Sequence, residues 1–154
     1  MLNTLADTEV LILCGGLGKR LRKVSGKTPK CMVTVADRPF LDIIINYLAN
    51  LGLRRFILGI GYKADVFKRY YRGRHKGLKI SFCREKNPLG TGGAVKNAGR
   101  LIKGKYFFVL NGDSFCRFDP GRFLKFHRKK HALASILLSK QLEGKDYGEI
   151  KTSR

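Results

Sequence analysis

The chain has 154 residues, of which 44% are hydrophobic, so we expect one domain over residues 1–154 with a buried core. With 32 lysines and arginines against 11 acidic residues, its net charge of +21 favours anionic partners such as nucleotides, sugar phosphates, nucleic acids or an acidic surface. A run of about 18 apolar residues and a signal-like start are both missing, which argues against a membrane span and a secretory signal. The four cysteines, none spaced as Cys-x-x-Cys, are expected to be free thiols in a reducing cytoplasm.

The first half of the chain alternates apolar runs with amphipathic segments. The segment 9–14, which is apolar throughout after Glu9, predicts a buried strand of a parallel sheet. A loop rich in Gly, Lys and Arg follows over residues 15–30. An amphipathic helix is then predicted from Pro39 to Gly52, because proline suits the first turn of a helix and glycine its C-terminal end. Residues 55–60 predict a second strand.

The second half continues this alternation. The predicted elements are a helix over 64–71, a strand over 78–83, a glycine-rich turn over 88–93, a helix over 94–101, a strand over 106–110, a helix over 122–130 and a fifth strand over 132–139. Strands that alternate with helices predict an α/β fold, a Rossmann-like three-layer α/β/α arrangement with a mostly parallel central sheet. The loops after Leu13, Cys83 and Leu110 then meet at the carboxyl edge of the sheet, where such folds bind ligands.

The loop after the first strand has the composition of a polyphosphate site. Gly15, Gly16 and Gly18 allow backbone N–H groups to approach an anion closely. Arg20 adds a permanent charge with a two-pronged fork, and Lys30 adds a second cation. The glycine spacing matches neither the Walker A loop nor the dinucleotide fingerprint. Taken alone, the loop is also compatible with a tight turn that binds nothing.

Asp113 is a candidate metal ligand. It closes the Asn111-Gly112-Asp113 sequence directly after an apolar strand, which puts its carboxylate at the ligand edge of the sheet. A triphosphate normally binds with Mg²⁺, which prefers one or two carboxylates together with phosphate oxygens. A helix cap or an Asx-turn is an equally good reading of this aspartate on sequence logic alone.

The order of the motifs is typical of a known family. The chain resembles sugar-1-phosphate nucleotidyltransferases in Leu-Cys-Gly-Gly-Leu-Gly-Lys-Arg over 13–20, Pro-Lys over 29–30, Gly-Ile-Gly-Tyr-Lys-Ala over 59–64, Pro-Leu-Gly-Thr-Gly-Gly-Ala over 88–94 and Asn-Gly-Asp-Ser over 111–114. The 88–94 element is most similar to the D-glycero-D-manno-heptose 1-phosphate guanylyltransferase branch. The resemblance implies the nucleotide-diphospho-sugar transferase fold.

The resemblance also implies an activity of the EC 2.7.7 type. A nucleotidyl group would pass from a nucleoside triphosphate, GTP by the branch assignment, to a sugar 1-phosphate such as heptose 1-phosphate, with release of pyrophosphate. The product would be a cytoplasmic precursor of lipopolysaccharide, capsule or S-layer glycan. The oligomeric state is not readable from the sequence.

Roles follow for the positions that match the family motifs. The resemblance implies nucleotide contacts for Leu13, Gly15, Gly16, Gly18, Lys19, Glu85, Gly90 and Thr91, catalytic contacts for Arg20 and Lys30, sugar contacts for Asn111, Tyr147 and Gly148, and Mg²⁺ binding for Asp113. Arg20 would bind the leaving pyrophosphate, and Lys30 would bridge the phosphates of both substrates. The alternatives are surface charges for Lys30 and Glu85 and a plain turn for Gly148.

The match departs from the family in three places. Lys19 replaces the usual Thr, and Cys31 replaces a usual second Pro. Family members also continue past this length with a Glu-Lys pair and a second metal-binding Asp. We therefore expect nucleotide binding to be more secure than turnover, and a truncated, catalytically impaired nucleotide-binding domain is the first alternative. A basic RNA-binding protein, suggested by the charge, is the second.

Overall fold

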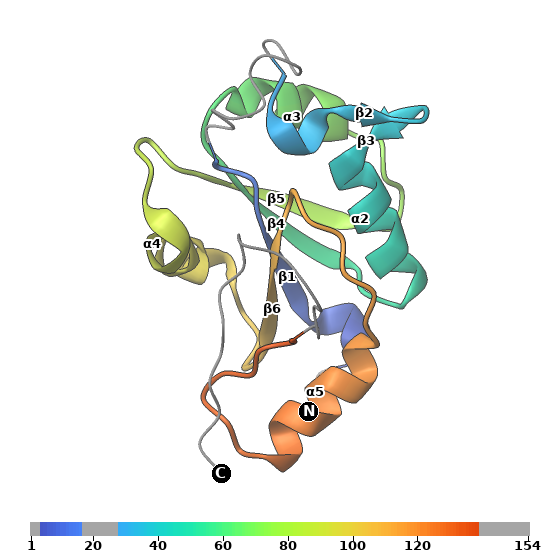
Figure 1. Ribbon diagram of the computed structural model, residues 1–154, viewed down its shortest axis with the longest axis vertical. Helices are drawn as coiled ribbons and strands as arrows, with labels where there is room; N and C mark the ends of the chain where they lie inside the picture. Colours follow the sequence, from blue (N-terminus) through green and yellow to red (C-terminus); the bar gives the residue numbers. More distant parts are fainter. Residues whose placement is uncertain (1–3, 17–27, 139–154) are drawn as a thin grey trace, which may run out of the picture.

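The computed structural model describes residues 4–16 and 28–138, which build a four-stranded parallel sheet with helices on both faces (Figure 1). The strands, in spatial order, are β5 (Lys79–Arg84), β4 (Arg55–Ile60), β1 (Glu9–Leu13) and β6 (Phe107–Asn111). The helices are α2 (Phe40–Asn50), α3 (Ala64–Tyr71), α4 (Gly90–Ala98) and α5 (Pro120–Lys129). Among the described helices, none combines the length and apolar character that crossing a membrane requires.

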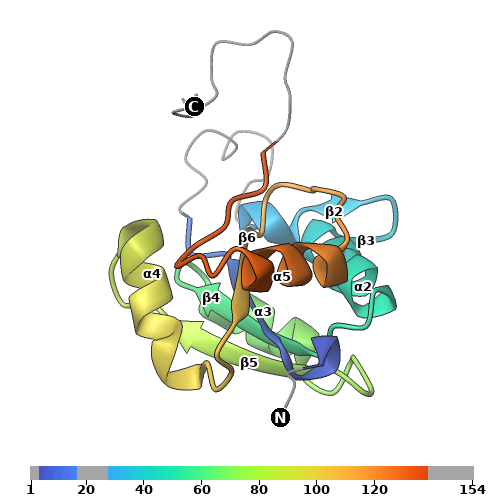
Figure 2. The same cartoon turned by 90° about the horizontal axis from the view of Figure 1, so that it is seen from below.

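The helices divide between the two faces of the sheet. One apolar cluster joins α2, α3 and α5 to the sheet through side chains such as Leu41, Phe67 and Leu124. A smaller cluster on the opposite face joins α4 to the sheet through Ala98 and Leu11. Figure 2 shows α4 on one side of the strands and α2 on the other. The predicted three-layer α/β/α arrangement is therefore confirmed.

β1 is the centre of the sheet. Leu11 pairs with Ile57 of β4 on one side and with Val109 of β6 on the other. A strand between two neighbours and two helical layers meets no water, and Val10, Leu11 and Ile12 are fully buried. This environment explains why the strand is a continuous apolar run, without the alternation of a half-exposed strand.

The order of the strands creates a topological switch point between β1 and β6. From β1 the chain moves outward through β4 to β5, and then returns to place β6 on the other side of β1. The loops that leave β1 and β6 therefore diverge at the carboxyl edge, where open α/β sheets leave a crevice for ligands. Gly112, the residue after β6, donates its N–H to the carbonyl oxygen of Leu13, the last residue of β1, at 2.9 Å, which extends the pairing one residue past β6.

Two sequence predictions are wrong. Residues 132–138, predicted as most of a fifth strand, form no strand, because this described segment has no ladder partner. The predicted glycine-rich turn over 88–93 is helical from residue 90 onward, since α4 begins at Gly90, which enters it from the left-handed region with φ of 68°. Burial of Ala94 and Ala98 against the sheet then outweighs the poor helix propensity of the glycines.

Several short elements were not predicted. They are the 3₁₀ turns η1 (Leu5–Asp7), η3 (Lys30–Met32) and η4 (Gly99–Leu101), and a hairpin of β2 (Thr34–Val35) and β3 (Arg38–Pro39). The hairpin turn contains Ala36 with φ of 60°, a conformation that no glycine or asparagine signalled in the sequence. α5 also begins earlier than predicted, because Asp119 caps it by accepting a hydrogen bond from the N–H of Arg122.

Substitution of Gly112 tests the close approach at the switch point. A Cβ at this position would lie 2.8 Å from the Cys14 sulfur and 3.1 Å from the Leu13 carbonyl oxygen. We expect Gly112→Ala to lower the free energy of unfolding by about 1–3 kcal/mol, the usual cost of overpacking, in urea titrations. Gly99→Ala is the control, because its Cβ would meet no atom within 4 Å. Equal stability of the two variants would contradict the packing argument.

Candidate functional site

The carboxyl edge of the sheet brings together the ends of β1 and β6 and the turn η3. Lys30, the first residue of η3, contacts Asp113 through Nζ and Oδ2 at 2.8 Å, although 83 positions separate them in the chain. β1 leads directly into Gly15 and Gly16 at the same edge. The structure thus places a cation, a carboxylate and a glycine loop at the switch point.

The Lys30–Asp113 pair is open to solvent. The two side chains are 41% and 40% exposed. The hydrogen bond from Lys30 lowers the pKa of Asp113, and the Ser114 hydroxyl, which donates to the other carboxylate oxygen at 3.3 Å, lowers it further. Asp113 is therefore ionised at neutral pH. An exposed pair stabilises a fold little, so its two charges remain available to a ligand.

Lys30 is positioned by the residues that follow it. Cys31 and Met32 are buried in the main apolar cluster, while Lys30 stays exposed at the start of the same turn. The thiol of Cys31 interacts with that of Cys14, which is the largest cause that raises the pKa of Cys14, followed by burial. The raised pKa keeps the Cys14 thiol protonated, so it packs with the buried Cys31 side chain as a small apolar group and fixes η3 against the end of β1.

Glu85, the residue after β5, lies against the start of the glycine loop at Gly15. Its backbone N–H extends the β4–β5 pairing by donating to the Ile60 carbonyl at 2.8 Å, and its carboxylate accepts the Leu89 N–H at 3.4 Å. A Cβ on Gly15 would stand 2.8 Å from Glu85 Oε1, and one on Gly61 would stand 3.3 Å from the Gly15 carbonyl. Glycine at 15 and 61 therefore lets the Glu85 carboxylate approach the loop backbone.

The other described candidates line the same edge. Leu13 is the last residue of β1, and its carbonyl oxygen accepts a hydrogen bond from the Gly112 N–H. Gly90 and Thr91 are exposed at the N-terminus of α4, where backbone N–H groups point outward and favour anions. Asn111 is the exposed last residue of β6. Gly18, Lys19, Arg20, Tyr147 and Gly148 lie outside the described residues.

Sequence reasoning did not find three of these contacts. The thiol pair joins Cys14 to Cys31, and only the position of Cys31 beside Lys30 could have pointed to it. The approach of Gly61 to Gly15 could have been suspected from the Gly-Ile-Gly sequence at the end of β4. The distance between Lys30 and Asp113 has no sequence signal, because it depends on the path of the intervening chain.

The donor set defines what this edge can bind. Within residues 4–16 and 28–138, no three or more His, Cys, Asp or Glu side chains gather as a metal cluster. A single carboxylate such as Asp113 suits Mg²⁺ when substrate phosphates supply further oxygen ligands. Lys30 and the backbone N–H groups of the glycine loop suit the phosphates themselves.

The sequence is similar to known proteins over most of its length. The profile of the nucleotidyl transferase family matches residues 9–154. The chain is 42% identical over 126 residues to a D-glycero-alpha-D-manno-heptose 1-phosphate guanylyltransferase from Campylobacter jejuni, an alignment that covers 82% of this chain and 56% of the relative. It is 37% identical over 144 residues to a protein of the same name from Aneurinibacillus thermoaerophilus, which covers 94% and 63%.

The fold is similar to a solved structure as well. HddC from Yersinia pseudotuberculosis superposes with a TM-score of 0.72 at 42% identity, covering 78% of this chain and 54% of HddC. The same protein has been solved complexed with GMP-PN. The chain thus spans between about half and two thirds of the length of these relatives.

Replacing Lys30 tests the electrostatics of the site. In Lys30→Met, the pKa of Asp113 should rise toward its ordinary value, because the dominant hydrogen bond to the carboxylate is lost. A lowered pKa in the folded state adds stability at pH values above the unfolded pKa of about 4, and this stability is lost as pH falls through the folded pKa. The wild type should therefore have a slightly larger free energy of unfolding than the variant at neutral pH, and this difference should disappear in acid.

Carboxyl-detected NMR titration measures this pKa directly. Arg38→Met is the matched control, because Arg38 lowers the pKa of Asp37 in an exposed ion pair elsewhere on the surface. The control should raise the pKa of Asp37 and leave that of Asp113 unchanged. An Asp113 titration that is identical in wild type and Lys30→Met would refute the assigned contact.

Proposed function

The chain belongs to the nucleotidyl transferase family, and from this premise we propose that it binds a nucleoside triphosphate where β1 and β6 end and transfers the nucleotidyl group to a sugar 1-phosphate. One observation carries the proposal: Lys30 and Asp113 meet at 2.8 Å beside the glycine loop, at the switch point of the sheet. This arrangement supplies a cation and backbone N–H donors for phosphate, and a carboxylate for a metal ion.

We propose GTP as the triphosphate and heptose 1-phosphate as the acceptor. Two relatives carry the name of a heptose 1-phosphate guanylyltransferase, and the similar HddC was solved with GMP-PN. The Glu85 carboxylate beside Gly15 also suits guanine, whose N1–H and 2-amino group are both donors. A cytoplasmic role in making lipopolysaccharide, capsule or S-layer glycan precursors follows from this substrate pair.

The proposed reaction is an in-line displacement. An oxygen of the sugar phosphate attacks the α-phosphorus of the triphosphate, and pyrophosphate leaves. The attacking oxygen is already an anion, so no general base is required, and positioning with charge neutralisation supplies most of the rate. Mg²⁺ bound at Asp113 would neutralise charge on the phosphate oxygens.

The ion pair of the free protein gives Lys30 and Asp113 a defined role in that reaction. Lys30 neutralises Asp113 while the site is empty of substrate. When Lys30 turns to the phosphates of the two substrates, it frees the carboxylate for Mg²⁺. Because both side chains are about two-fifths exposed, this exchange of partners breaks no buried contact. Arg20 would hold the leaving pyrophosphate.

Nucleotide binding without turnover is the second candidate function. The observation that favours it is that the chain spans 56% and 63% of the two guanylyltransferases it resembles. Residues that complete the chemistry in a full-length protein can lie in the part that is not matched. Loss of one charged contact at a reacting phosphate costs roughly a hundredfold in rate.

Calorimetry with GTP and Mg²⁺ tests the binding step. We expect Arg20→Ala and Lys30→Ala each to weaken GTP binding by about tenfold to a hundredfold, the usual effect of removing a charged hydrogen-bond partner. Lys125→Ala is the control, because this exposed lysine lies on α5 away from the carboxyl edge. Wild-type protein that binds no triphosphate would remove both candidate functions.

Pyrophosphate release separates the two candidate functions. With Mg²⁺, GTP and heptose 1-phosphate, an active enzyme should release one pyrophosphate for each nucleotide-sugar formed, and faster than with ATP or UTP. The phosphate-free sugar is the control, since it cannot attack the α-phosphorus as an anion. GTP binding without release from any pair of triphosphate and sugar phosphate would leave the binding module as the function.

A further inference from the structure

The end of α3 and the turn that follows it carry exposed basic side chains, which we call the α3 patch. Its members are Lys68, Arg69, Arg72, Arg74 and Lys76. Among the described residues, none of these side chains forms an ion pair with a carboxylate. From position 43 to position 84 the sequence holds a single acidic residue, Asp65. The positive charge of the patch is therefore not balanced from nearby.

The helix dipole accounts for part of this charge. Cations in the last turn of a helix are stabilised by the exposed carbonyl groups there, which explains Lys68 and Arg69. The effect falls off within one turn, so it does not explain Arg74 and Lys76, which lie past the end of α3. These two residues point to a role other than stability of the helix.

The turn that carries the patch is anchored on the protein. The rings of Tyr71 and His75 are stacked, with their centroids 5.4 Å apart. His75 Nε2 contacts Asp42 Oδ1 of α2 at 2.8 Å, and these two side chains are only 11% and 10% exposed. Because the backbone between α3 and β5 is tied to α2 in this way, a ligand of the patch would order little further backbone on binding.

Arg74 presents a flat cation on this anchored turn. Its Cζ lies 4.3 Å from the centre of the Tyr70 ring, and its Nε donates to the Tyr70 carbonyl oxygen at 3.2 Å. Tyr70 in turn packs edge-on against Tyr71, with centroids 5.0 Å apart. A guanidinium supported by a ring can donate to a phosphate with its edge and stack a nucleobase on its plane.

The composition of the surface favours RNA over a membrane or a duplex. A helix that binds an acidic membrane surface inserts apolar side chains, and from position 61 to position 80 no large apolar side chain is exposed. A helix that reads a duplex enters a groove, whereas α3 packs on the sheet with Phe67 and Tyr71 buried. A single RNA strand supplies both phosphates for the cations and free bases for Arg74.

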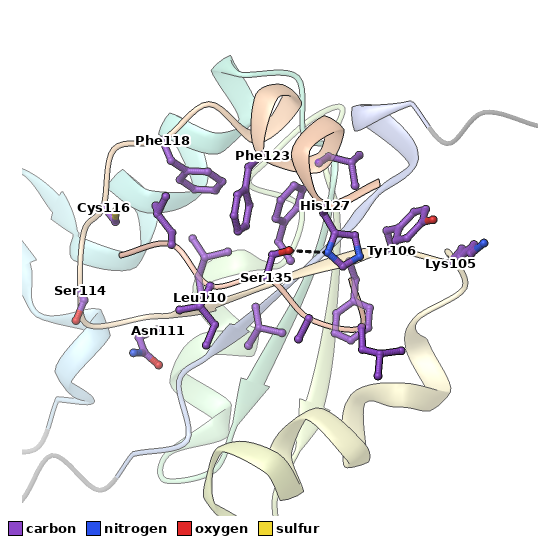
Figure 3. A pocket seen from close by; sticks show the side chains of 18 residues that line it. Lys105, Tyr106, Leu110, Asn111, Ser114, Cys116, Phe118, Phe123, His127 and Ser135 are labelled. Carbon is purple, nitrogen blue, oxygen red and sulfur yellow. Dashed lines mark hydrogen bonds between the residues drawn. The ribbon is translucent and has the colours of Figure 1, made fainter. Parts of the chain in front are cut away.

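α5 is the other strongly basic helix, and it suits this role less well. His127 turns toward the segment after the helix, with Nδ1 2.9 Å from Ser135 Oγ, beside a pocket of about 590 Å³ (Figure 3). The Arg128 guanidinium lies over the ring of Tyr106 at 5.2 Å. Phe126, which is 52% exposed, interrupts the remaining cations. The charged surface of α5 is therefore less continuous than the α3 patch.

We propose that the α3 patch binds single-stranded RNA through its phosphates, with a base stacked on Arg74. This function is additional to the proposed transfer reaction and uses a different surface. Lys30 and Asp113 meet at the carboxyl edge of the sheet, whereas the turn after α3 leads to the start of β5, at the amino edge of a parallel strand. RNA and a nucleoside triphosphate can then bind the same chain together.

Fluorescence anisotropy with a labelled RNA tests the proposal. The probe is a single strand of about 20 nucleotides with a 5′-hydroxyl, so that it carries no terminal triphosphate. Each phosphate neutralised on a single strand contributes about −0.7 to the slope of log K against log salt, so five contacts predict a slope of about −3.5. Binding should persist at constant ionic strength when GTP and Mg²⁺ are added to saturation.

Two double variants of equal net charge separate the patch from the overall charge. Arg69→Gln with Arg72→Gln should reduce the steepness of the salt slope by about 1.4 and weaken RNA binding by about tenfold or more near 0.1 M salt. Lys125→Gln with Lys129→Gln is the control, since both lysines are exposed on α5. Far-UV circular dichroism shows that both variants remain folded, because all four side chains lie at the surface.

The outcomes decide between the patch and other sources of binding. RNA binding that only the α3 variant weakens supports the proposal. Equal losses in the two double variants would overturn it, because net charge alone would then account for the affinity. Displacement of the RNA by GTP would also overturn it and place the RNA at the carboxyl edge.

A membrane is tested with vesicles that contain about 30% phosphatidylserine. Tighter binding to these vesicles than to RNA at equal phosphate concentration would overturn the proposal and assign the patch to a lipid surface. Neither double variant alters Lys30, Asp113 or the glycine loop, so a failure of RNA binding leaves the proposed transfer reaction untouched.

Discussion

The close approach of β1 and β6 at their carboxyl ends is the constraint on which the rest of the site depends. Gly112 donates to the Leu13 carbonyl at 2.9 Å, and its missing side chain leaves room for the Cys14 thiol. This contact continues the pairing of the sheet by one residue beyond β6. Asp113 is thereby held beside the start of the glycine loop, and a larger residue at 112 would separate the carboxylate from the backbone donors.

The charged side chains at this edge lie next to buried cysteine side chains. The buried Cys14 thiol contributes no charge, because contact with Cys31 and burial raise its pKa. Lys30 precedes Cys31 in η3 and contacts Asp113 where both side chains are exposed to solvent. A cation and an anion that neutralise each other can remain close in the free protein without repelling either a phosphate or a metal ion. The arrangement prepares the site for ligands of both signs at little cost to the fold.

The sequence predicted the parts of the fold that depend on burial. The apolar run of β1 and the amphipathic pattern of α2 located both elements, because their partners in the core are other apolar side chains. The start of α4 could not be predicted, since Gly90 enters a helix only because Ala94 and Ala98 pack on the sheet. Residues 132–138 have the composition of a strand but no neighbouring strand to pair with. Composition does not show whether such a neighbour is present. At the site, the order of the motifs identified the residues. Their contacts could not be predicted, because they depend on the path of the chain in three dimensions.

Within the described residues, the edge of β6 that faces away from β1 has no strand partner. Strand edges with exposed apolar side chains, here Phe107 and Val109, promote pairing with other chains and aggregation. Solubility of the chain is therefore expected to depend on how this edge is covered.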